Sequence, residues 1–283
     1  MAETSPTAPP TKPGRRPIPA RVASVERLTP RMLRVVLEGE ALEAFPVGEH
    51  TDHYVKLLLP APGADYGPLF DPEAIRATYP REQWPRTRAY TVRAYDPLSR
   101  RLTLDVVVHG EHGVAGPWAL QAAPGDHVQL LGPGGGYTAR DDAASHLLVG
   151  DPCVVPAIAA TLERLPAGAV ARVVLAVEDA DDELPLPSAA DVEVQWLHVG
   201  AQPDPDRVVA AVRALELPEG PFHAFVHGEA TTVREVRRHL VHERGAVPAE
   251  HSVSGYWKWQ RVDEDWRAEK REWVRLVEQD DAA

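Results

Sequence analysis

The segment at residues 86 to 93, RTRAYTVR, carries three arginines, although the chain as a whole is acidic. Arg88 and Tyr90 point to one face of an extended strand, because side chains alternate between the two faces. A guanidinium group binds a pair of phosphate oxygens, and a neighbouring aromatic ring stacks on a flat heterocycle. The segment therefore favours a nucleotide-binding strand, although a cross-strand arginine pair beside a core tyrosine gives the same pattern.

A second segment, HGEHGVAGPWA at residues 109–119, follows a strand-like run. Gly116 and Pro117 suit the N-cap and the first position of a helix. The start of a helix leaves backbone amides without partners, and such amides bind pyrophosphate groups. The amides expected to be available are those of Val114, Ala115, Gly116 and Trp118. Two separate segments thus predict contacts with phosphate.

Two histidine pairs raise the question of a metal site. His109 precedes His112, and His50 precedes His53, but neither pair has acidic or cysteine partners at a fitting spacing. Cys153 is the single cysteine, which excludes an intramolecular disulfide and any site built from several thiolates. We therefore expect no metal site and a reducing compartment.

The composition is typical of a globular protein outside membranes. The chain has 283 residues, of which 44% are hydrophobic and 25% charged, and this length suggests two domains. Its net charge of -12 argues against a nucleic-acid or membrane partner, because both need a broad basic surface. No run approaches the roughly 20 apolar residues of a membrane span, and residues 1–20 do not suit a signal peptide. We expect a cytoplasmic protein.

The chain between residues 21 and 131 contains short strand-like runs separated by Gly, Pro and Asp clusters. Leu102, Leu104 and Val106 share one face of such a run by the two-residue period of a strand. The runs are RVASVERL, MLRVVLEG, HYVKLLL, AYTVRAY, RLTLDVVVH and HVQLLG. Six of them predict a small antiparallel barrel at residues 17–140, after a disordered N-terminus at residues 1–16.

A long connection at residues 60–85 separates the third and fourth runs, well beyond the usual length of a hairpin loop. Asp71 followed by Pro72 predicts the start of a short helix within it, DPEAIRAT. Loops of this length are often functional, and a plain surface excursion is the alternative.

From Ser145 onward, strand-like and helix-like runs alternate, which is typical of a parallel sheet with crossover helices. The runs are SHLLVG, VVPAIAATLERL, ARVVLAVED, VEVQWLH, DRVVAAVRALEL, FHAFVHG and TTVREVRRHLVHER. They predict an α/β domain at residues 141–283, with the change of pattern falling at residues 137–144.

The tail contains apolar residues at helical spacing among charges, namely Trp266, Trp273, Leu276 and Val277. This pattern predicts an amphipathic C-terminal helix. Packing against the second domain is favoured over a lid or a surface for a partner.

A small barrel followed by an α/β domain is one way to hold a flavin, since ligand sites favour domain interfaces. Five segments, taken in order, resemble the siderophore-interacting protein family of FAD-dependent ferric-siderophore reductases over residues 17–259. These are RTRAYTVR, LDVVVHGEHGVAGPWA, APGDHVQLLGPGGGY, VHGEATTVREVRRHL and SGYWKW. The resemblance implies a six-stranded antiparallel Greek-key flavin-binding barrel followed by a Rossmann-like NAD(P)H-binding domain, as in ferredoxin reductases.

By this resemblance, Arg88 contacts the FAD phosphates, Tyr90 stacks on the isoalloxazine ring, and Thr91 lies near its N5 edge. Arg93 supports the polar edge of the ring or the adjacent strand. An ideal strand points Thr91 away from Tyr90, so either the strand bends after Tyr90 or Thr91 contributes its backbone. The glycine-rich turn is the second expected FAD contact, through His109, Gly113, Val114, Ala115, Gly116 and Trp118.

The resemblance also implies a basic pocket for a ferric siderophore above the flavin. Lys56 and Lys258 are similar to residues that line it, although each also suits a solvated surface charge. Gly134 stands where some relatives carry a basic residue. Either Arg261 or an arginine of the long loop, such as Arg81 or Arg86, would compensate.

The electron donor is NADPH or NADH by family analogy, with reduced ferredoxin as the alternative. The turn VGDPCVVPAI has no glycine after Gly150, unlike a standard dinucleotide site, and Asp151 repels phosphate. The candidate contacts at the nicotinamide end are Asp151, Glu229, Tyr256 and Trp257.

These inferences predict a protein that binds FAD noncovalently, reduces iron(III) held by a siderophore and releases ferrous iron in the cytoplasm. No catalytic nucleophile is required, because the flavin carries the electrons. Two rival functions remain: a ferredoxin-reductase-like enzyme that passes electrons to a protein or small acceptor, and a nonenzymatic module that binds flavin or siderophore.

Overall fold

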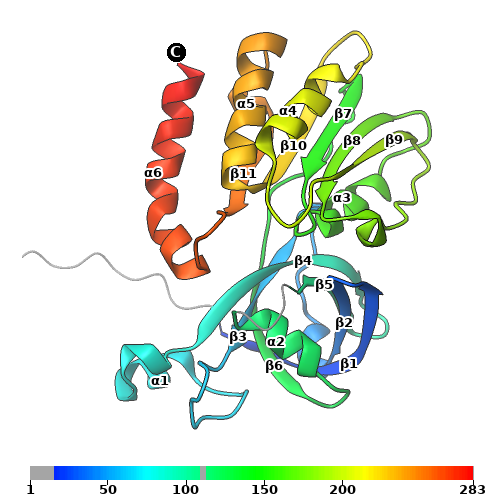
Figure 1. The fold of residues 1–283 in the computed structure, drawn as a ribbon. Helices are drawn as coiled ribbons and strands as arrows, with labels where there is room; N and C mark the ends of the chain where they lie inside the picture. Colours follow the sequence, from blue (N-terminus) through cyan, green and yellow to red (C-terminus); the bar gives the residue numbers. More distant parts are fainter. Residues whose placement is uncertain (1–15, 109–112, 283) are drawn as a thin grey trace, which may run out of the picture.

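Two units follow each other along the chain in the computed structural model, which describes residues 16–108 and 113–282 (Figure 1). The first is a closed barrel in the strand order β1-β2-β5-β4-β3-β6, with neighbouring strands antiparallel. Its strands are β1 (Ile18–Thr29), β2 (Met32–Glu38), β3 (Tyr54–Leu59), β4 (Arg86–Asp96), β5 (Arg101–Val107) and β6 (His127–Gly134). The six-stranded barrel predicted from the sequence is confirmed.

The barrel core follows the two-residue period of its strands. Leu102, Leu104 and Val106 of β5 are fully buried on one face. Asp105, on the opposite face, is buried as well, because Arg34 of β2 covers it and binds both of its oxygens at 2.8 Å. At Asp105 the strand is therefore buried on both faces, with an ion pair on the outer one.

Strand β4 bends where it passes from one neighbour to the other. It pairs with β3 as far as Thr91 and with β5 from Val92 onward, with a register shift between Val92 and Ala94. Thr91 and Val92 are both buried although they are consecutive, so the alternation of faces breaks there. The bend after Tyr90, one of the two alternatives left by the sequence, is present.

Two short helices accompany the barrel. Helix α1 (Pro72–Thr78) begins as predicted, and the Asp71 side chain caps it by accepting from the Glu73 amide at 2.8 Å. Helix α2 (Ala115–Gln121) begins before the predicted Pro117, with Val114 as N-cap and no side-chain cap. Gly113 has a φ of 85°, so the chain turns into the helix earlier than the Gly-Pro pair suggested.

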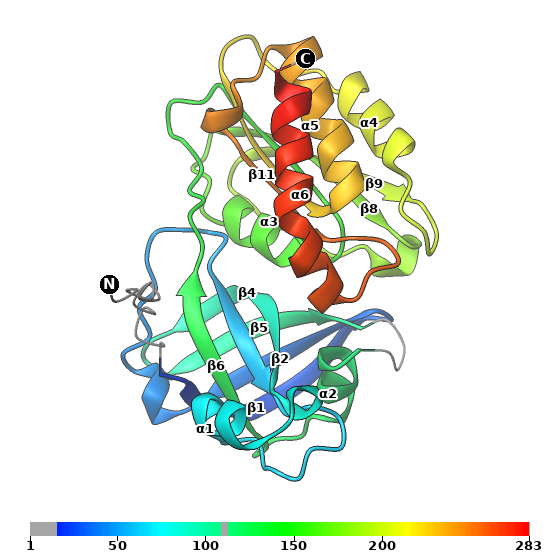
Figure 2. The same cartoon turned by 90° about the vertical axis from the view of Figure 1, so that its left-hand side faces the viewer.

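The second unit is a parallel sheet in the order β11-β10-β7-β8-β9 (Figure 1). Figure 2 shows this unit above the barrel, with α5 and α6 in front of the sheet. Its strands are β7 (Ser145–Gly150), β8 (Val170–Val177), β9 (Asp191–His198), β10 (Phe222–Glu229) and β11 (Ser252–Trp257). Its helices are α3 (Val155–Leu162), α4 (Pro205–Ala214), α5 (Ala230–Arg244) and α6 (Asp263–Asp281). The sequence did not predict β11 as a strand, because its serines and glycine interrupt the apolar pattern. None of the described helices has the length and apolarity needed to cross a bilayer.

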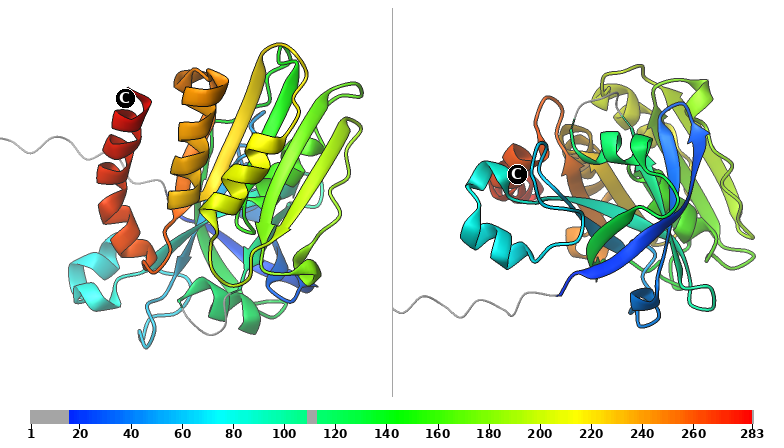
Figure 3. Two further views of the ribbon diagram at one scale, coloured as in Figure 1. Left: turned by 45° about the horizontal axis from the view of Figure 1, so that its top comes forward. Right: turned by 90° about the horizontal axis from the view of Figure 1, so that it is seen from below.

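Helix α6 lies beside α5 and packs into the core, as predicted (Figure 3). Trp266, Trp273 and Val277 are buried in the same apolar cluster as α4 and α5. The two indoles donate to backbone carbonyls of β11 and of the first residue of α5, at 2.9 and 3.1 Å. The helix is therefore an integral part of the α/β unit.

Three histidines lie at the amino ends of adjacent strands, at the end of the sheet that is far from the barrel. His223 of β10 lies between His146 of β7 and His251 before β11, with ring centroids 6.3 Å apart in both pairs. Burial lowers the pKa of all three rings, and that of His223 falls to about 4, with further repulsion from the other two.

We expect this histidine cluster to make the fold sensitive to mild acid. The pKa of His223 is lower in the folded chain than its usual value of about 6.5, so the folded state binds fewer protons between these values. Stability is complete above about pH 6.5 and falls as the pH drops toward 4, with about 2 kcal/mol lost by about pH 5. Urea unfolding at about pH 7.5 and pH 5 measures this loss, and His223→Gln should reduce it. An unchanged loss in the variant would assign the acid sensitivity to other groups.

Candidate cofactor and substrate site

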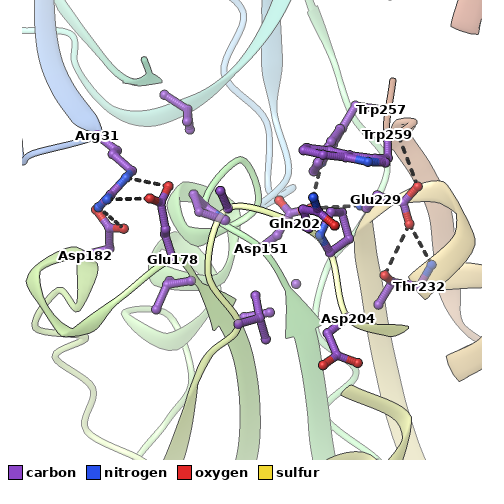
Figure 4. Close-up of a pocket in the computed structure, with 18 of the residues that line it drawn as sticks. Arg31, Asp151, Glu178, Asp182, Gln202, Asp204, Glu229, Thr232, Trp257 and Trp259 are labelled. Atoms are coloured by element: carbon purple, nitrogen blue, oxygen red, sulfur yellow. Dashed lines mark hydrogen bonds and ion pairs between the residues drawn. The ribbon is translucent and has the colours of Figure 1, made fainter. Parts of the chain in front are cut away.

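A cavity of about 850 Å³ opens at the carboxyl ends of the parallel strands, where they face the barrel (Figure 4). Its walls include the ends of β7, β8, β10 and β11, the segment at 199–204, and barrel residues from the β1–β2 turn and the end of β5. The strand order reverses between β7 and β10. Nucleotides bind at this point of open parallel sheets.

Asp151 joins three strand ends at the centre of the cavity wall. Its carboxylate accepts from the Glu229 amide at 2.8 Å, the Trp257 indole at 2.7 Å, and the amide and thiol of Cys153 at 3.0 and 2.8 Å. Burial raises the pKa of Asp151, and these donors oppose the shift. Burial also raises the pKa of the Cys153 thiol, as does the neighbouring Asp151 charge. The network holds β7, β10 and β11 together.

Gly228 is required for this network. Its φ is 124°, and a Cβ built on it would lie 2.4 Å from an Asp151 carboxylate oxygen. Both the backbone conformation and the space therefore demand glycine. Gly228 was not among the residues predicted from the sequence, although a glycine at the carboxyl end of a buried strand was a usable signal.

Glu229 fixes the neighbouring wall of the cavity. One carboxylate oxygen caps α5 by accepting from the amides of Thr231 and Thr232 at 2.8 and 2.9 Å. The other accepts from the Trp259 amide at 3.3 Å. The same side chain thus positions the start of α5 and the segment after β11.

Tyr256 is separated from the other residues expected at the nicotinamide end. Asp151, Glu229 and Trp257 all line the cavity, whereas Tyr256 does not. Its ring lies on the other side of β11, 4.7 Å from the His227 ring, and burial raises the pKa of its phenol. The alternation of side chains along a strand explains the separation. A nicotinamide contact for Tyr256 stays a prediction.

Lys258 and Arg261, both expected to bind substrate, lie together on the cavity wall. They share one carboxylate of α6, with the Lys258 ammonium 3.3 Å and the Arg261 guanidinium 2.8 Å from Glu269. Lys56 lies apart from them, exposed on the outer face of β3. The Lys56 charge is close enough to Asp263 to affect the pKa of the Asp263 carboxyl group.

The space that a side chain at position 134 would need is occupied. A Cβ on Gly134 would lie 2.4 Å from the Tyr54 ring. A basic residue is therefore incompatible with Tyr54 in its present position. Of the arginines expected to compensate, Arg86 lies 4.0 Å from Glu264 of α6, and its role toward the substrate stays a prediction.

Arg88 and Tyr90 share one face of β4. They are the cross-strand partners of two core residues of β3, Leu57 and Val55 respectively. The Arg88 guanidinium binds Glu264 through two nitrogens at 2.9 and 3.3 Å, and Asp263 at 3.2 Å. Tyr90 packs against the barrel core, burial raises its pKa, and no described residue hydrogen-bonds its hydroxyl. A guanidinium fork that holds two carboxylate oxygens also fits two phosphate oxygens.

Arg93 joins the two units of the fold. Its guanidinium binds Glu163 at the end of α3 through two nitrogens and lies 3.9 Å from Asp105 of β5. This position agrees with support of the adjacent strand. Thr91 is buried beside it, in the bend of β4. Flavin contacts for both residues stay predictions.

The turn before α2 fits a phosphate ligand in part. The amides of Ala115 and Gly116 donate to no described residue, whereas the Trp118 amide donates to the Val114 carbonyl at 3.2 Å. The expectation that the Trp118 amide is available is therefore wrong, because the helix starts earlier. Gly113 and Val114 form the turn itself, and His109 lies outside the described residues. The amides of Ala115 and Gly116, the Arg88 guanidinium and the Tyr90 ring are groups of the kinds that FAD needs, and their contacts with FAD stay predictions.

Two family models cover most of the chain. Residues 21–137 match the siderophore-interacting FAD-binding domain, and residues 143–260 match the siderophore-interacting protein model. This chain belongs to the siderophore-interacting protein family.

Three curated relatives of this siderophore-interacting protein match over nearly their whole length. An uncharacterized protein of Mycobacterium tuberculosis is 39% identical, over 91% of this chain and 96% of that protein. The ferric vibriobactin reductase ViuB of Vibrio cholerae is 33% identical, over 87% and 96%. The NADPH-dependent ferric-chelate reductase of Escherichia coli is 32% identical, over 83% and 91%.

Solved structures agree with the fold. The siderophore-interacting protein SipS of Aeromonas hydrophila superposes with a TM-score of 0.80 at 26% identity, covering 92% of this chain and 99% of that one. A siderophore utilization protein of T. fusca gives 0.75 at 32% identity, covering 88% and 95%. The FAD/NAD-binding domain of a Vibrio cholerae nitric oxide dioxygenase shares the fold alone. Its TM-score is 0.59 at 16% identity, covering 86% of this chain and 98% of that one. The predicted barrel followed by a Rossmann-like domain is confirmed.

Proposed function

We propose that this siderophore-interacting protein is an FAD-dependent reductase of ferric siderophores that releases ferrous iron in the cytoplasm, with a nicotinamide nucleotide as electron donor. The observation that carries the proposal is the junction of the expected flavin strand, the nucleotide cavity and a group of basic side chains at the start of α6. The names of the Vibrio cholerae and Escherichia coli relatives support the same reaction.

Strand β4, which is expected to bind the flavin, adjoins the cavity through Cys153. Its thiol is close enough to Tyr90 to affect the pKa of the phenol, and the same thiol donates to Asp151 in the cavity wall. A donor in the cavity and a flavin at Tyr90 therefore belong to neighbouring sites, which direct transfer of a hydride requires.

The chemistry that bound FAD would supply is the conversion of one hydride donor into two single-electron transfers, so that one nucleotide would reduce two ferric ions with release of one proton. Iron(III) binds oxygen ligands more tightly than iron(II), so reduction loosens the chelate. The protein residues would bind and orient the partners. Arg88 and the α2 amides would hold the cofactor phosphates, and Tyr90 would stack on the ring. Asp151 holds the strand ends together around the cavity. No covalent bond to the chain is needed.

Basic side chains surround the amino-terminal half of α6, where a negatively charged ferric chelate would find complementary charge. Three of them contact Asp263 and Glu264, and two contact Glu269. They are Arg86, Arg88, Arg267, Lys258 and Arg261, and Lys56 adds a charge beside Asp263. This group supplies the local positive charge in an otherwise acidic protein.

The double variant Lys258→Ala, Arg261→Ala should weaken binding of an anionic ferric siderophore about 10-fold, because it removes two charged donors at the cavity wall. Glu269→Gln should strengthen binding, since it frees both donors from a competing carboxylate. Quenching of protein fluorescence by the ferric siderophore measures both constants.

The matched control is Arg213→Ala, which breaks an exposed ion pair with Glu243 outside the cavity. Its affinity should equal that of the wild type. Equal affinities in all four proteins would place the substrate elsewhere.

A competition experiment separates the proposal from its rivals. The FAD-loaded protein is reduced without oxygen and mixed with a ferric siderophore and an oxidised ferredoxin together. Reoxidation with formation of ferrous iron supports the reductase, whereas reduction of the ferredoxin alone supports a protein acceptor. A flavin that no donor reduces, despite siderophore binding, supports a nonenzymatic module. Reduced ferredoxin belongs among the donors tested, together with NADH and NADPH.

A further inference from the structure

The cavity ends beside β8 in an acidic cluster, in which Glu178, Asp179 and Asp182 surround Arg31. Figure 4 shows Arg31 with Glu178 and Asp182. The Arg31 guanidinium lies 2.7 Å from Glu178, 2.9 Å from Asp179 and 2.8 Å from Asp182. Arg31, Glu178 and Asp182 line the cavity. The cluster therefore faces any nucleotide that extends to this end.

The place of Glu178 in the sheet defines what it would meet. The order β9-β8-β7-β10-β11 makes β7 the first strand of a dinucleotide-binding sheet and β8 the second. Glu178 directly follows the last residue of β8. In such sheets an acidic residue after the second strand accepts hydrogen bonds from the ribose 2′-hydroxyl of NAD, whereas an arginine there accommodates the 2′-phosphate of NADP.

Arg31 is not available to bind a 2′-phosphate of NADP. Nε and Nη2 bind Glu178, Nη1 binds Asp182, and Nη2 also binds Asp179. Its donors are thus engaged by carboxylates, and hydrogen bonding by Arg31 lowers the pKa of Asp179. Glu178 keeps free acceptor capacity, because a carboxylate accepts about four hydrogen bonds and Arg31 uses two.

The remaining basic residues of the cavity wall leave the balance negative. Lys258 and Arg261 are paired with Glu269. Arg27 donates to the Pro30 carbonyl at 2.8 Å and has no carboxylate partner among the described residues. The three carboxylates around Arg31 outnumber the two arginines at this end of the cavity, and a 2′-phosphate adds about 1.5 to 2 further negative charges. The negative charge of the cluster would therefore repel a 2′-phosphate at this end of the cavity.

We propose that this protein selects NADH over NADPH, with Glu178 accepting from the adenosine ribose and the cluster excluding a 2′-phosphate. The inference rests on the nicotinamide donor of the proposed function. It sets this chain apart from the Escherichia coli relative, whose name specifies NADPH.

Calorimetric titration of the FAD-loaded protein with NAD⁺, NADP⁺, 5′-AMP and its 2′-phosphorylated form tests the selection without turnover. We expect the two ligands without the 2′-phosphate to bind at least about 10-fold more tightly than their phosphorylated counterparts. Glu178→Gln keeps a hydrogen-bond acceptor and removes the charge, so the preference should fall several-fold. Asp179→Asn removes the charge of a half-buried carboxylate that also binds Arg31, and should lower the preference in the same direction. The control Glu183→Gln removes an exposed carboxylate outside the cavity and should change nothing.

Equal or tighter binding of the phosphorylated ligands would overturn the inference, as would their selective loss in Arg27→Gln. Failure of all four ligands to bind would overturn it too. The proposed function is tested separately, because a chemically reduced flavin needs no nucleotide: reduction of a ferric siderophore by that protein would leave the reductase standing with another donor.

Discussion

Replacement of Arg88 by alanine is expected to strip FAD from the protein, weakening its binding by about 10- to 100-fold. Hydrogen bonds between charged groups are worth about 1.5 to 3 kcal/mol, and the Arg88 fork can hold two phosphate oxygens. Its present partners are acidic residues of α6, so the guanidinium is already oriented for an anion. The ratio of flavin to protein after gel filtration and a titration with FAD measure the loss.

Two controls separate cofactor binding from stability. Arg267→Ala removes another contact between α6 and β4, since Arg267 binds Thr87 at 2.7 and 2.9 Å, but it leaves the Arg88 fork intact. Lys258→Ala should keep its flavin and mainly weaken binding of the siderophore. Equal flavin retention in Arg88→Ala and Lys258→Ala would contradict this division of roles.

The second large effect is expected at Gly228. Gly228→Ala should lower the free energy of unfolding by about 2 to 4 kcal/mol, because it combines backbone strain with displacement of a buried carboxylate. The Asp151 network should open as a result, and nucleotide binding in the cavity should fall as well. Urea unfolding and calorimetry measure the two consequences.

Gly168→Ala is the matched control. Gly168 also has a positive φ, of 92°, but a Cβ there would meet nothing within 4 Å. It should therefore show only the backbone cost, about 1 to 2 kcal/mol, and no loss of nucleotide binding. If both variants lost the same stability and kept the same affinity, Asp151 would have no special dependence on Gly228.

Local sequence patterns predicted the architecture because each element carries its own periodicity. The barrel strands alternate apolar and polar residues, and the helices of the α/β unit separate its strands by the expected lengths. Strand β11 was missed because Ser252, Ser254 and Gly255 break the pattern, and its register comes from pairing with β10. The start of α2 was misplaced because the φ of Gly113 decides where the chain turns.

Two parts of the site were predictable, one from a single segment and the other from the family resemblance. Arg88 and Tyr90 do lie on one face of β4, and Asp151, Glu229 and Trp257 do line one cavity. The cluster around Arg31 was not predictable, because it joins a barrel turn to residues after β8 and such ion pairs leave no local signature. Tyr256 was grouped with Trp257 although consecutive residues of a strand point to opposite faces.

The central claim is transfer of electrons from the flavin of this protein to iron held by a siderophore. FAD-loaded protein is reduced with dithionite without oxygen, freed of excess reductant and mixed with a ferric siderophore and a ferrous-iron trap. We expect the flavin to reoxidise and two ferrous ions to appear per FAD, faster than with free reduced FAD at the same concentration. Flavin that stays reduced, or iron that appears no faster than with free FAD, would contradict the account.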